Sequence, residues 1–314
     1  MPDAVFIPAE PSAASAPGSE AAAGSGPASA PGSGAASADA PPAADRLTAT
    51  ELARGPWDPH AQHGGAPAAL LVRAFERCPG GEHLLLARAT YELLRPAPLG
   101  PLEVSSSVVR PGRRVQLLEA SLRTEDGVEV VRARGLKVQR ADAPPVASGG
   151  DAPPVGTGGD APPVGTGGDA VPKEGPPANA RPNDYPSDGV PMFATDAMEI
   201  RFVAGAFLEP GPATAWFRLR HPLVAGESPS PLQRLAAAAD FGNGISAVLP
   251  WHRYVFINPD LTIYVEREPV GEWIRLESET RIGRDGIGLC ESLICDQCGR
   301  VGRATQALLV TRRG

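Results

Sequence analysis

Asp240 is an acidic residue at a position where helix physics disfavours one. Residues 230–242 predict a helix, with Ser230 as the N-cap and Gly242 just after the last turn. Asp240 therefore lies in the last turn, where a carboxylate faces the negative end of the helix dipole and adjoins the apolar stripe of the helix. Residues that break a local rule of stability are often functional, so Asp240 is a candidate base or water-binding acid. A solvated acid at a helix end is the alternative.

Gln306 is a candidate partner for this acid. Residues 301–311 predict a strand, in which Gln306 alternates with Ala304 and Leu308, so its amide lies on an otherwise apolar face. A buried amide without a partner costs about 1–3 kcal/mol. We expect Asp240, or a water that Asp240 holds, to be that partner. A hydrogen bond to neighbouring backbone is the alternative.

A histidine and two glycines open the other predicted helix. His63, Gly64 and Gly65 precede a helix over residues 66–77. Glycines at a helix start let backbone N–H groups approach a ligand, and the helix dipole favours negative charge there. These three residues are therefore predicted to bind substrate, with the amides of Gly64 and Gly65 as oxyanion donors to a carbonyl. An ordinary tight turn is the alternative.

The cysteines and histidines do not predict a metal site. The chain has four cysteines, and Cys290, Cys295 and Cys298 contain a single CxxC pair without a histidine nearby in sequence. The five histidines show no pair at metal-ligand spacing. The sequence also lacks a Gly-x-Ser-x-Gly elbow and a Walker-type loop. We therefore expect no metal and no redox cofactor.

The element pattern occurs twice, each time as a helix followed by four strand-like runs. In the first part the helix over 66–77 precedes runs at 84–94, 102–110, 115–124 and 128–139. In the second part a strand at 213–220 and the helix at 230–241 precede runs at 254–267, 273–282, 288–295 and 301–311. This repetition predicts an α+β fold in which two antiparallel sheets, from an internal duplication, each wrap a helix. Gly135 matches Gln306 in the duplication, so we expect chemistry in only one of the two related sites.

Two segments have too few large apolar side chains to build a core. Residues 9–44 contain only Ala, Pro, Gly, Ser, Glu and Asp, and residues 141–190 are rich in Pro, Gly, Ala and Asp and include a nine-residue repeat. Both are expected to be disordered, because so little apolar burial does not offset the entropy of ordering. The expected units are residues 1–140, with 9–44 as an insertion between two short strands, a linker at 141–190, and residues 191–314.

The net charge of -7 arises from these two segments, which together carry minus eight. The remainder has no basic stripe of the kind that binds nucleic acid. No apolar run approaches the roughly 18 residues needed to span a bilayer, and the N-terminal residues lack the pattern of a signal peptide. The sequence therefore predicts a cytoplasmic protein with no nucleic-acid partner and no membrane span.

Three stretches of the sequence resemble the thioesterase-II-like acyl-CoA thioesterases, which are double-hotdog proteins. These stretches are residues 55–70, 202–211 and 239–246, and the resemblance extends over 46–140 and 196–312. The resemblance implies two hotdog units, a role in lipid metabolism, and an acyl-CoA or related thioester as substrate. It leaves open whether the protein forms a homo-oligomer.

The resemblance also assigns roles to three residues. In that family an Asp late in the second-half helix, a Ser or Thr on the following strand and a Gln on the last strand bind and polarise the attacking water. These roles fall on Asp240, Asn258 and Gln306. Asn258 departs from the hydroxyl pattern of the family, although an amide also hydrogen-bonds water.

The expected function is hydrolysis of an acyl-CoA-type thioester to a free acid and a thiol. One alternative is a non-catalytic module that binds an acyl group or acyl-CoA in the same pocket. Another is a hotdog hydratase or dehydratase, which needs an Asp and a His in one site. That alternative ranks last, because no histidine except His252 follows Asp240 at a close, regular interval in the sequence.

Overall fold

The computed structural model describes residues 2–9, 44–141, 175–185 and 189–313, so most of the expected insertion and repeat linker lie outside it. The first half contains β1 Phe6–Pro8, β2 Ala44–Ala49, the 3-10 turn η1 Glu51–Ala53, α1 Gly65–Glu76, β3 Leu84–Leu93, β4 Gly100–Arg110, β5 Val115–Thr124 and β6 Glu129–Gln139. The second half contains β7 Arg181–Pro182, the π-helical turn η2 Phe193–Ala197, β8 Met198–Ala206, β9 Glu209–Leu219, α2 Pro231–Ala239, α3 Gly242–Ile245, β10 Tyr254–Ile257, β11 Asp260–Val265, β12 Ile274–Ile282, β13 Ile287–Asp296 and β14 Gly299–Arg312.

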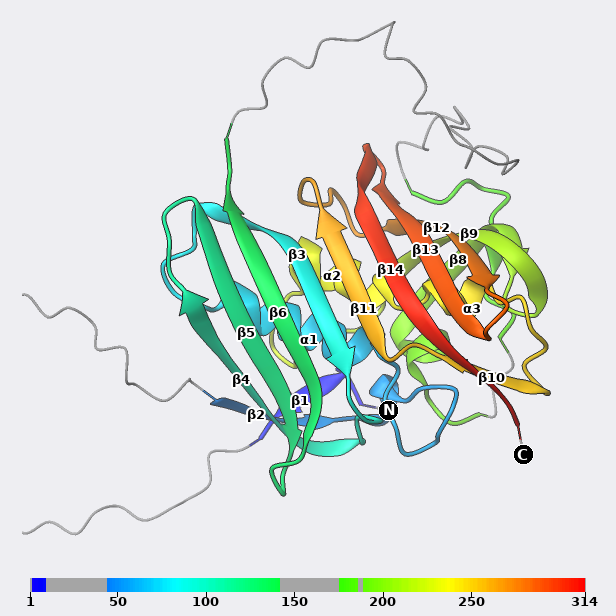
Figure 1. Cartoon of the computed structure of the whole chain (residues 1–314), viewed down its shortest axis with the longest axis horizontal. Coiled ribbons are helices and arrows are strands. Elements are labelled where there is room, and N and C mark those ends of the chain that lie inside the picture. The colour runs from blue at the N-terminus through cyan, green and yellow to red at the C-terminus, as the bar shows by residue number, and fades with distance from the viewer. Residues whose placement is uncertain (1, 10–43, 142–174, 186–188, 314) are drawn as a thin grey trace, which may run out of the picture.

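The strands of the described residues form one 14-stranded antiparallel sheet. Its order is β1-β2-β4-β5-β6-β3-β11-β14-β13-β12-β9-β8-β7, and β10 pairs with β14 off this path. β3 and β11 join the two halves at the centre, where Thr90 pairs with Thr262. The strand order repeats on either side of this junction, and the sheet curves around α1 and α2 (Figure 1). The predicted α+β double hotdog is confirmed.

Three details differ from the predicted elements. β8 is absent from the prediction, although its alternate residues Met198, Ile200 and Phe202 are buried with the period of a strand. The predicted run at 254–267 is two strands, β10 and β11, and the break between them contains Pro259, which has no N–H to donate to a ladder. α2 ends one residue before its C-cap, Asp240, and the short helix α3 follows at once.

Residues 175–185, which fall inside the expected linker, contact the second half. β7 pairs with β8, with Arg181 opposite Phe202. The Asn183 side-chain amide also donates to the Ala194 carbonyl at 2.8 Å. The second half therefore includes residues before 191, where the sequence had placed its start.

Small residues let the two helices approach each other closely inside the sheet. The four alanines at 236–239 are 0 % exposed. A Cβ on Gly65 would lie 2.4 Å from the Ala237 carbonyl oxygen, so only glycine allows this approach. The N-terminus of α1 consequently meets the C-terminus of α2, and this places the His63-Gly64-Gly65 segment beside Asp240.

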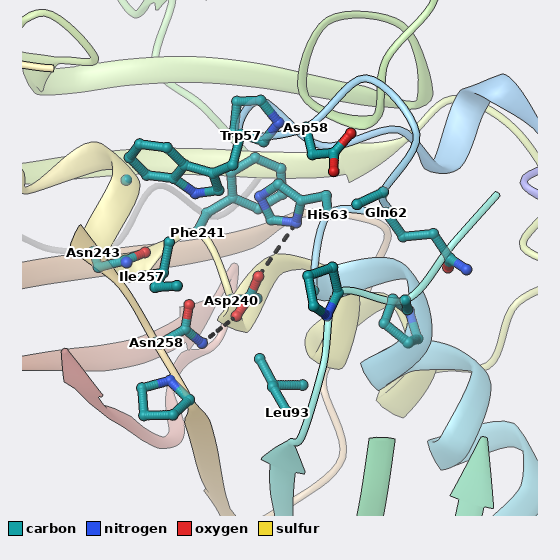
Figure 2. A pocket seen from close by; sticks show the side chains of 18 of the residues that line it. Trp57, Asp58, Gln62, His63, Leu93, Asp240, Phe241, Asn243, Ile257 and Asn258 are labelled. Atoms are coloured by element: carbon teal, nitrogen blue, oxygen red, sulfur yellow. Dashed lines mark hydrogen bonds and ion pairs between the residues drawn. The ribbon is translucent and has the colours of Figure 1, made fainter. Parts of the chain in front are cut away.

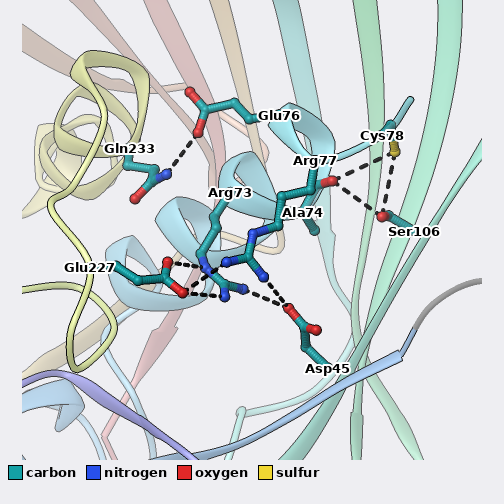
Figure 3. A network of polar contacts seen from close by, with 9 residues as sticks. All are labelled: Asp45, Arg73, Ala74, Glu76, Arg77, Cys78, Ser106, Glu227 and Gln233. Atoms are coloured by element: carbon teal, nitrogen blue, oxygen red, sulfur yellow. Dashed lines mark hydrogen bonds and ion pairs between the residues drawn. The ribbon is translucent and has the colours of Figure 1, made fainter. Parts of the chain in front are cut away.

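A network of polar contacts holds the opposite ends of the two helices (Figure 3). Ser230 Oγ and Gln233 Nε2, at the start of α2, donate to the Glu76 carboxylate at the end of α1, at 2.6 and 2.7 Å. Arg73, which is 5 % exposed, donates to both Glu227 carboxylate oxygens at 2.6 and 2.7 Å. Its remaining nitrogen donates to Asp45 Oδ2 at 2.8 Å. Arg73 thus ties α1 to β2 and to the loop before α2.

Arg73→Met is expected to lower the free energy of unfolding by roughly 1.5–3 kcal/mol, because it removes charge-assisted hydrogen bonds to two carboxylates. Arg77→Met is the matched control. Arg77 contacts the same two acids, but 51 % of its side chain is exposed, so its loss should cost less than about 1 kcal/mol. Urea unfolding of both variants measures the difference. Equal losses would show that burial of Arg73 adds nothing to the strength of this network.

Candidate active site

Asp240 lies where α2 ends, and two amide side chains from distant strands contact its carboxylate. Asp240 is 6 % exposed. Asn258 Nδ2 donates to Oδ1 at 2.8 Å, and Gln306 Nε2 donates to the same oxygen at 3.1 Å. The fold therefore brings the three residues Asp240, Asn258 and Gln306 into contact, and Figure 2 shows the bond between Asp240 and Asn258.

Both amides are fixed by a second contact. Gln306 is 1 % exposed in β14, and its Oε1 accepts the Asn243 backbone N–H at 3.1 Å, which settles which end of the amide faces Asp240. Asn258 follows β10, and its Nδ2 also donates to the Asp260 carbonyl at 3.0 Å. Because two donors share Oδ1, the other carboxylate oxygen, Oδ2, is the one left for a reacting group.

Oδ2 of Asp240 faces the start of α1. His63 Nδ1 lies 3.3 Å from it. The Gly65 N–H donates to the same ring nitrogen at 3.0 Å, so Nδ1 carries a lone pair and a neutral His63 ring has its proton on Nε2. The contact between Nδ1 and Oδ2 is then a hydrogen bond only when Oδ2 is protonated.

Burial sets the charge of both groups. It raises the pKa of Asp240 to about 7, against the opposing effect of hydrogen bonds from Asn258, Gln306 and the Gly65 N–H. It lowers the pKa of His63 to about 3. The His63 ring also stacks against both Phe193 and Phe241, with centroid distances of 5.2 and 4.2 Å. At neutral pH the pair is therefore not an ion pair, and Asp240 exchanges its proton near physiological pH.

The two glycines before α1 differ in what their amides do. The Gly65 N–H is engaged, because it donates to His63 Nδ1 and also lies close enough to the Asp240 carboxylate to lower the pKa of that group. Within the described residues the Gly64 N–H has no hydrogen-bond acceptor, and Gly64 lines the cavity beside Asp240. A Cβ on Gly64 would lie 2.6 Å from Asp240 Oδ2. Gly64 is therefore the residue that offers a free donor next to the acid.

The proximity of His63 and Asp240 bears on the hydratase alternative. The sequence ranked that alternative last, because it compared Asp240 with the histidines that follow it closely in the chain. His63 belongs to the first half, and the antiparallel packing of α1 on α2 brings it to Asp240. A pair made by two halves of a duplication has no signature in local spacing.

A cavity of about 310 Å³ opens at this carboxylate. Four aromatic residues that the sequence did not single out as functional line one part of it: Trp57, Tyr185, Phe207 and Trp251. They come from four separate segments, so no local pattern could have identified them as a group.

The position that matches Gln306 in the first half is filled by packing. A Cβ on Gly135 would lie 3.2 or 3.3 Å from atoms of Leu86, Leu118 and Phe75. A glutamine side chain has no room there. This packing supports the expectation that only the second half carries the amide.

In the described parts of the chain, no group of three or more His, Cys, Asp or Glu residues is placed to hold a metal ion. In the same residues, no helix is long and apolar enough to cross a membrane. Cys78, Cys290 and Cys295 are buried free thiols, and Cys298 is an exposed one.

Comparison with known families assigns the chain. Residues 53–137 match the acyl-CoA thioesterase N-terminal domain, and residues 172–310 match the acyl-CoA thioesterase C-terminal domain. The chain belongs to the acyl-CoA thioesterase family. The protein is therefore a thioesterase, and its general reaction is the hydrolysis of a thioester.

Solved structures with the same fold include two that cover most of the chain. One is a hot dog fold protein of unknown function from Alicyclobacillus acidocaldarius, with a TM-score of 0.62 and 16 % identity over 88 % of this chain and 95 % of that one. Another is acyl-CoA thioesterase II from Mycobacterium marinum, with a TM-score of 0.53 and 14 % identity over 84 % of this chain and 97 % of that one. Identities this low show the fold alone. A search of curated proteins found no match.

Proposed function

We propose that this thioesterase hydrolyses acyl-CoA thioesters with Asp240 as the general base. The observation that carries the proposal is the buried carboxylate, with Oδ1 held by two amides and Oδ2 left facing Gly64. Asn258 and Gln306 hold the Asp240 carboxylate through Oδ1, so that Oδ2 binds the attacking water. The Gly64 N–H, at the positive end of the α1 dipole, donates to the thioester carbonyl oxygen.

The reaction then takes two steps. A water bound to Oδ2 gives its proton to Asp240, and its oxygen adds to the carbonyl carbon, which forms a tetrahedral oxyanion at the Gly64 N–H. The oxyanion collapses, the C–S bond breaks, and the proton on Oδ2 passes to the departing sulfur. The products are the free acid and the thiol of CoA, and Asp240 returns to the carboxylate.

His63 supports Asp240 between these two steps. While Oδ2 carries the proton, it can donate to His63 Nδ1, which lies 3.3 Å away, and it then shares the Nδ1 lone pair with the Gly65 N–H. The low pKa of His63 keeps the ring neutral, so it accepts this hydrogen bond without taking the proton away. We therefore propose that His63 positions Asp240 and does not itself contact the substrate.

Release of free thiol from acyl-CoAs by the purified protein tests the proposal. Wild-type protein should release thiol and free acid in equal amounts. Binding of acyl-CoA with no thiol released would instead support the alternative of a non-catalytic binding module.

Hydration of a 2-enoyl-CoA is a second candidate, because His63 and Asp240 do share one site. The neutral, stacked His63 ring is less suited to it, since burial lowers the pKa of His63 to about 3 and so makes the ring a weak base. Loss of the enoyl absorbance of crotonyl-CoA with no thiol release would support the hydratase. Thiol release with the double bond intact would support the thioesterase.

The rate should depend on pH through Asp240. The base must be ionised, and burial raises the pKa of Asp240 to about 7. We therefore expect kcat/KM to fall about tenfold per pH unit below about 7 and to level off above it, once the uncatalysed rate is subtracted. A profile of kcat/KM from acid to mildly alkaline pH measures this. An acid limb centred near the ordinary pKa of an aspartate would show that a different group, or an unburied Asp240, is the base.

A further inference from the structure

The cavity at Asp240 has an aromatic end, made by Trp57, Tyr185, Phe207 and Trp251. The rings of Trp57 and Trp251 stack with centroids 4.7 Å apart. Tyr185 contacts Trp251 and Phe207 edge-on, at 6.2 and 5.3 Å. The Trp251 indole N–H donates to the Phe207 carbonyl at 3.1 Å, so this polar group is already satisfied.

The aromatic end is firmly supported from behind. Phe256, which is 3 % exposed, packs edge-on against both tryptophans at 5.3 and 4.7 Å. The Arg313 guanidinium lies 5.5 Å from the Trp57 ring centroid and donates to the Trp251 carbonyl at 2.8 Å. Close-packed side chains of this kind move only at a cost, so the wall limits what fits beside Asp240.

Exposed residues mark where the cavity opens to solvent. Leu94, Ile257 and Leu309 line the cavity and are 46 %, 37 % and 57 % exposed. Arg95 lines it too, is exposed, and has no ion-pair partner within the described residues. The exposed acid that lines the cavity, Asp58, instead follows Trp57 at the aromatic end. A phosphate-bearing CoA is therefore favoured beside Arg95 and disfavoured beside Asp58.

The volume of the cavity limits the acyl group. A cavity of about 150 Å³ holds benzene, which corresponds to about 25 Å³ per carbon. On that scale the 310 Å³ cavity holds about twelve non-hydrogen atoms. The thioester carbon, oxygen and sulfur take part of that space beside Asp240.

We infer that the aromatic end binds the acyl group, and that it selects compact acyl groups, of up to about ten carbons or with a single aromatic ring, against long fatty acyl chains. This inference rests on the proposed hydrolysis at Asp240. Trp57 and Trp251 are then residues that determine specificity, because they close the space into which a longer chain would extend.

A series of acyl-CoAs tests the limit on chain length. Hexanoyl-, octanoyl-, decanoyl- and phenylacetyl-CoA should give the highest kcat/KM, and palmitoyl-CoA should be at least about tenfold poorer, because its last methylenes stay outside the cavity. Equal kcat/KM values for palmitoyl- and octanoyl-CoA would overturn the inference and leave the proposed hydrolysis intact.

Widening the aromatic end should relax the limit. Trp251→Ala is expected to raise the ratio of palmitoyl to octanoyl kcat/KM by about tenfold or more. Trp273→Ala is the matched control, because Trp273 stacks under Arg218 and does not line the cavity, so it should leave the ratio unchanged. If Trp251→Ala does not fold, Trp57→Ala removes the other half of the stacked pair. An unchanged ratio in a folded variant of either tryptophan contradicts the inference.

Binding separates this inference from the proposed function. Asp240→Asn protein should bind octanoyl-CoA more tightly than palmitoyl-CoA in titration calorimetry, whether or not wild type turns these compounds over. That order of affinities without hydrolysis by wild type would refute the proposed function and support the inference. The reverse order would refute the inference.

Discussion

Asp240→Asn should lower kcat for the best acyl-CoA at least about a hundredfold, because the variant keeps the shape of the side chain but has no base. The asparagine can keep the contacts of the protonated acid with Asn258, Gln306 and His63. Its oxygen accepts from Asn258 and Gln306, and its amide N–H donates to His63 Nδ1. Thiol release under saturating substrate measures the loss. Turnover close to that of wild type would remove Asp240 from the mechanism.

The same variant should be more stable than wild type at neutral and alkaline pH. The pKa of Asp240 is about 7 in the folded protein against an ordinary value of 3.8, so the folded state holds an extra proton between these values and loses stability as pH rises through them. Ionising the buried acid costs on the order of 4 kcal/mol, at about 1.4 kcal/mol per pKa unit. The gain from Asp240→Asn should therefore be small near pH 4, grow up to about pH 7 and stay constant above it.

Melting temperatures of wild type and variant across this pH range test the linkage. Asp58→Asn is the matched control, since Asp58 lines the same cavity but is exposed. It should change neither turnover nor stability appreciably. A gain in stability that is the same at acid and neutral pH would argue against a buried, ionising Asp240.

Gly64→Ala should also lower kcat/KM, by roughly a hundredfold. The backbone of Gly64 is in the ordinary right-handed helical region, with φ -59° and ψ -22°, so an alanine fits the backbone well. Its Cβ, however, would lie 2.6 Å from Asp240 Oδ2, closer than real atoms approach. Either the carboxylate or the Gly64 N–H must then move, and a displacement of about 1 Å costs on the order of a hundredfold in rate.

Gly244→Ala is the control for this change. Gly244 lines the same cavity, and a Cβ there would meet only Phe207, at an ordinary 3.7 Å. Its kcat/KM should stay within a few-fold of wild type, and both variants should melt as cooperatively as wild type. Full activity of Gly64→Ala would show that hydrolysis does not depend on the positions of the Asp240 carboxylate and the Gly64 N–H.

The pattern of apolar residues determined most of the elements, because helix and strand periods are local properties. α1 and the strands β4, β5, β13 and β14 lie within a few residues of their predicted bounds. β8 carried a readable alternation as well. The two-residue break before β11 was marked by Pro259, and it matters because it turns Asn258 out of the ladder and toward Asp240.

For the site, the sequence could select residues, but their contacts depend on the fold. Asp240 and Gln306 could be selected from the sequence, because each is a polar residue on an apolar face, and the family resemblance added Asn258. Their contact, and the use of a single oxygen by both amides, depend on α2 ending beside β14. The choice of Gly64 over Gly65 as the free donor also needed the structure, since His63 takes the Gly65 N–H.

By itself, the sequence predicted a duplicated α+β fold, which the family resemblance identified as a double hotdog, and it made Asp240 a candidate base. It could do so because the burial pattern, the helix ends and the glycine positions depend on residues that are close together in the sequence. Only the tertiary structure decided that His63 faces Asp240 and that four aromatic residues from separate segments close the cavity. Those contacts join residues of the two halves, and close packing between them, not sequence spacing, sets the distances.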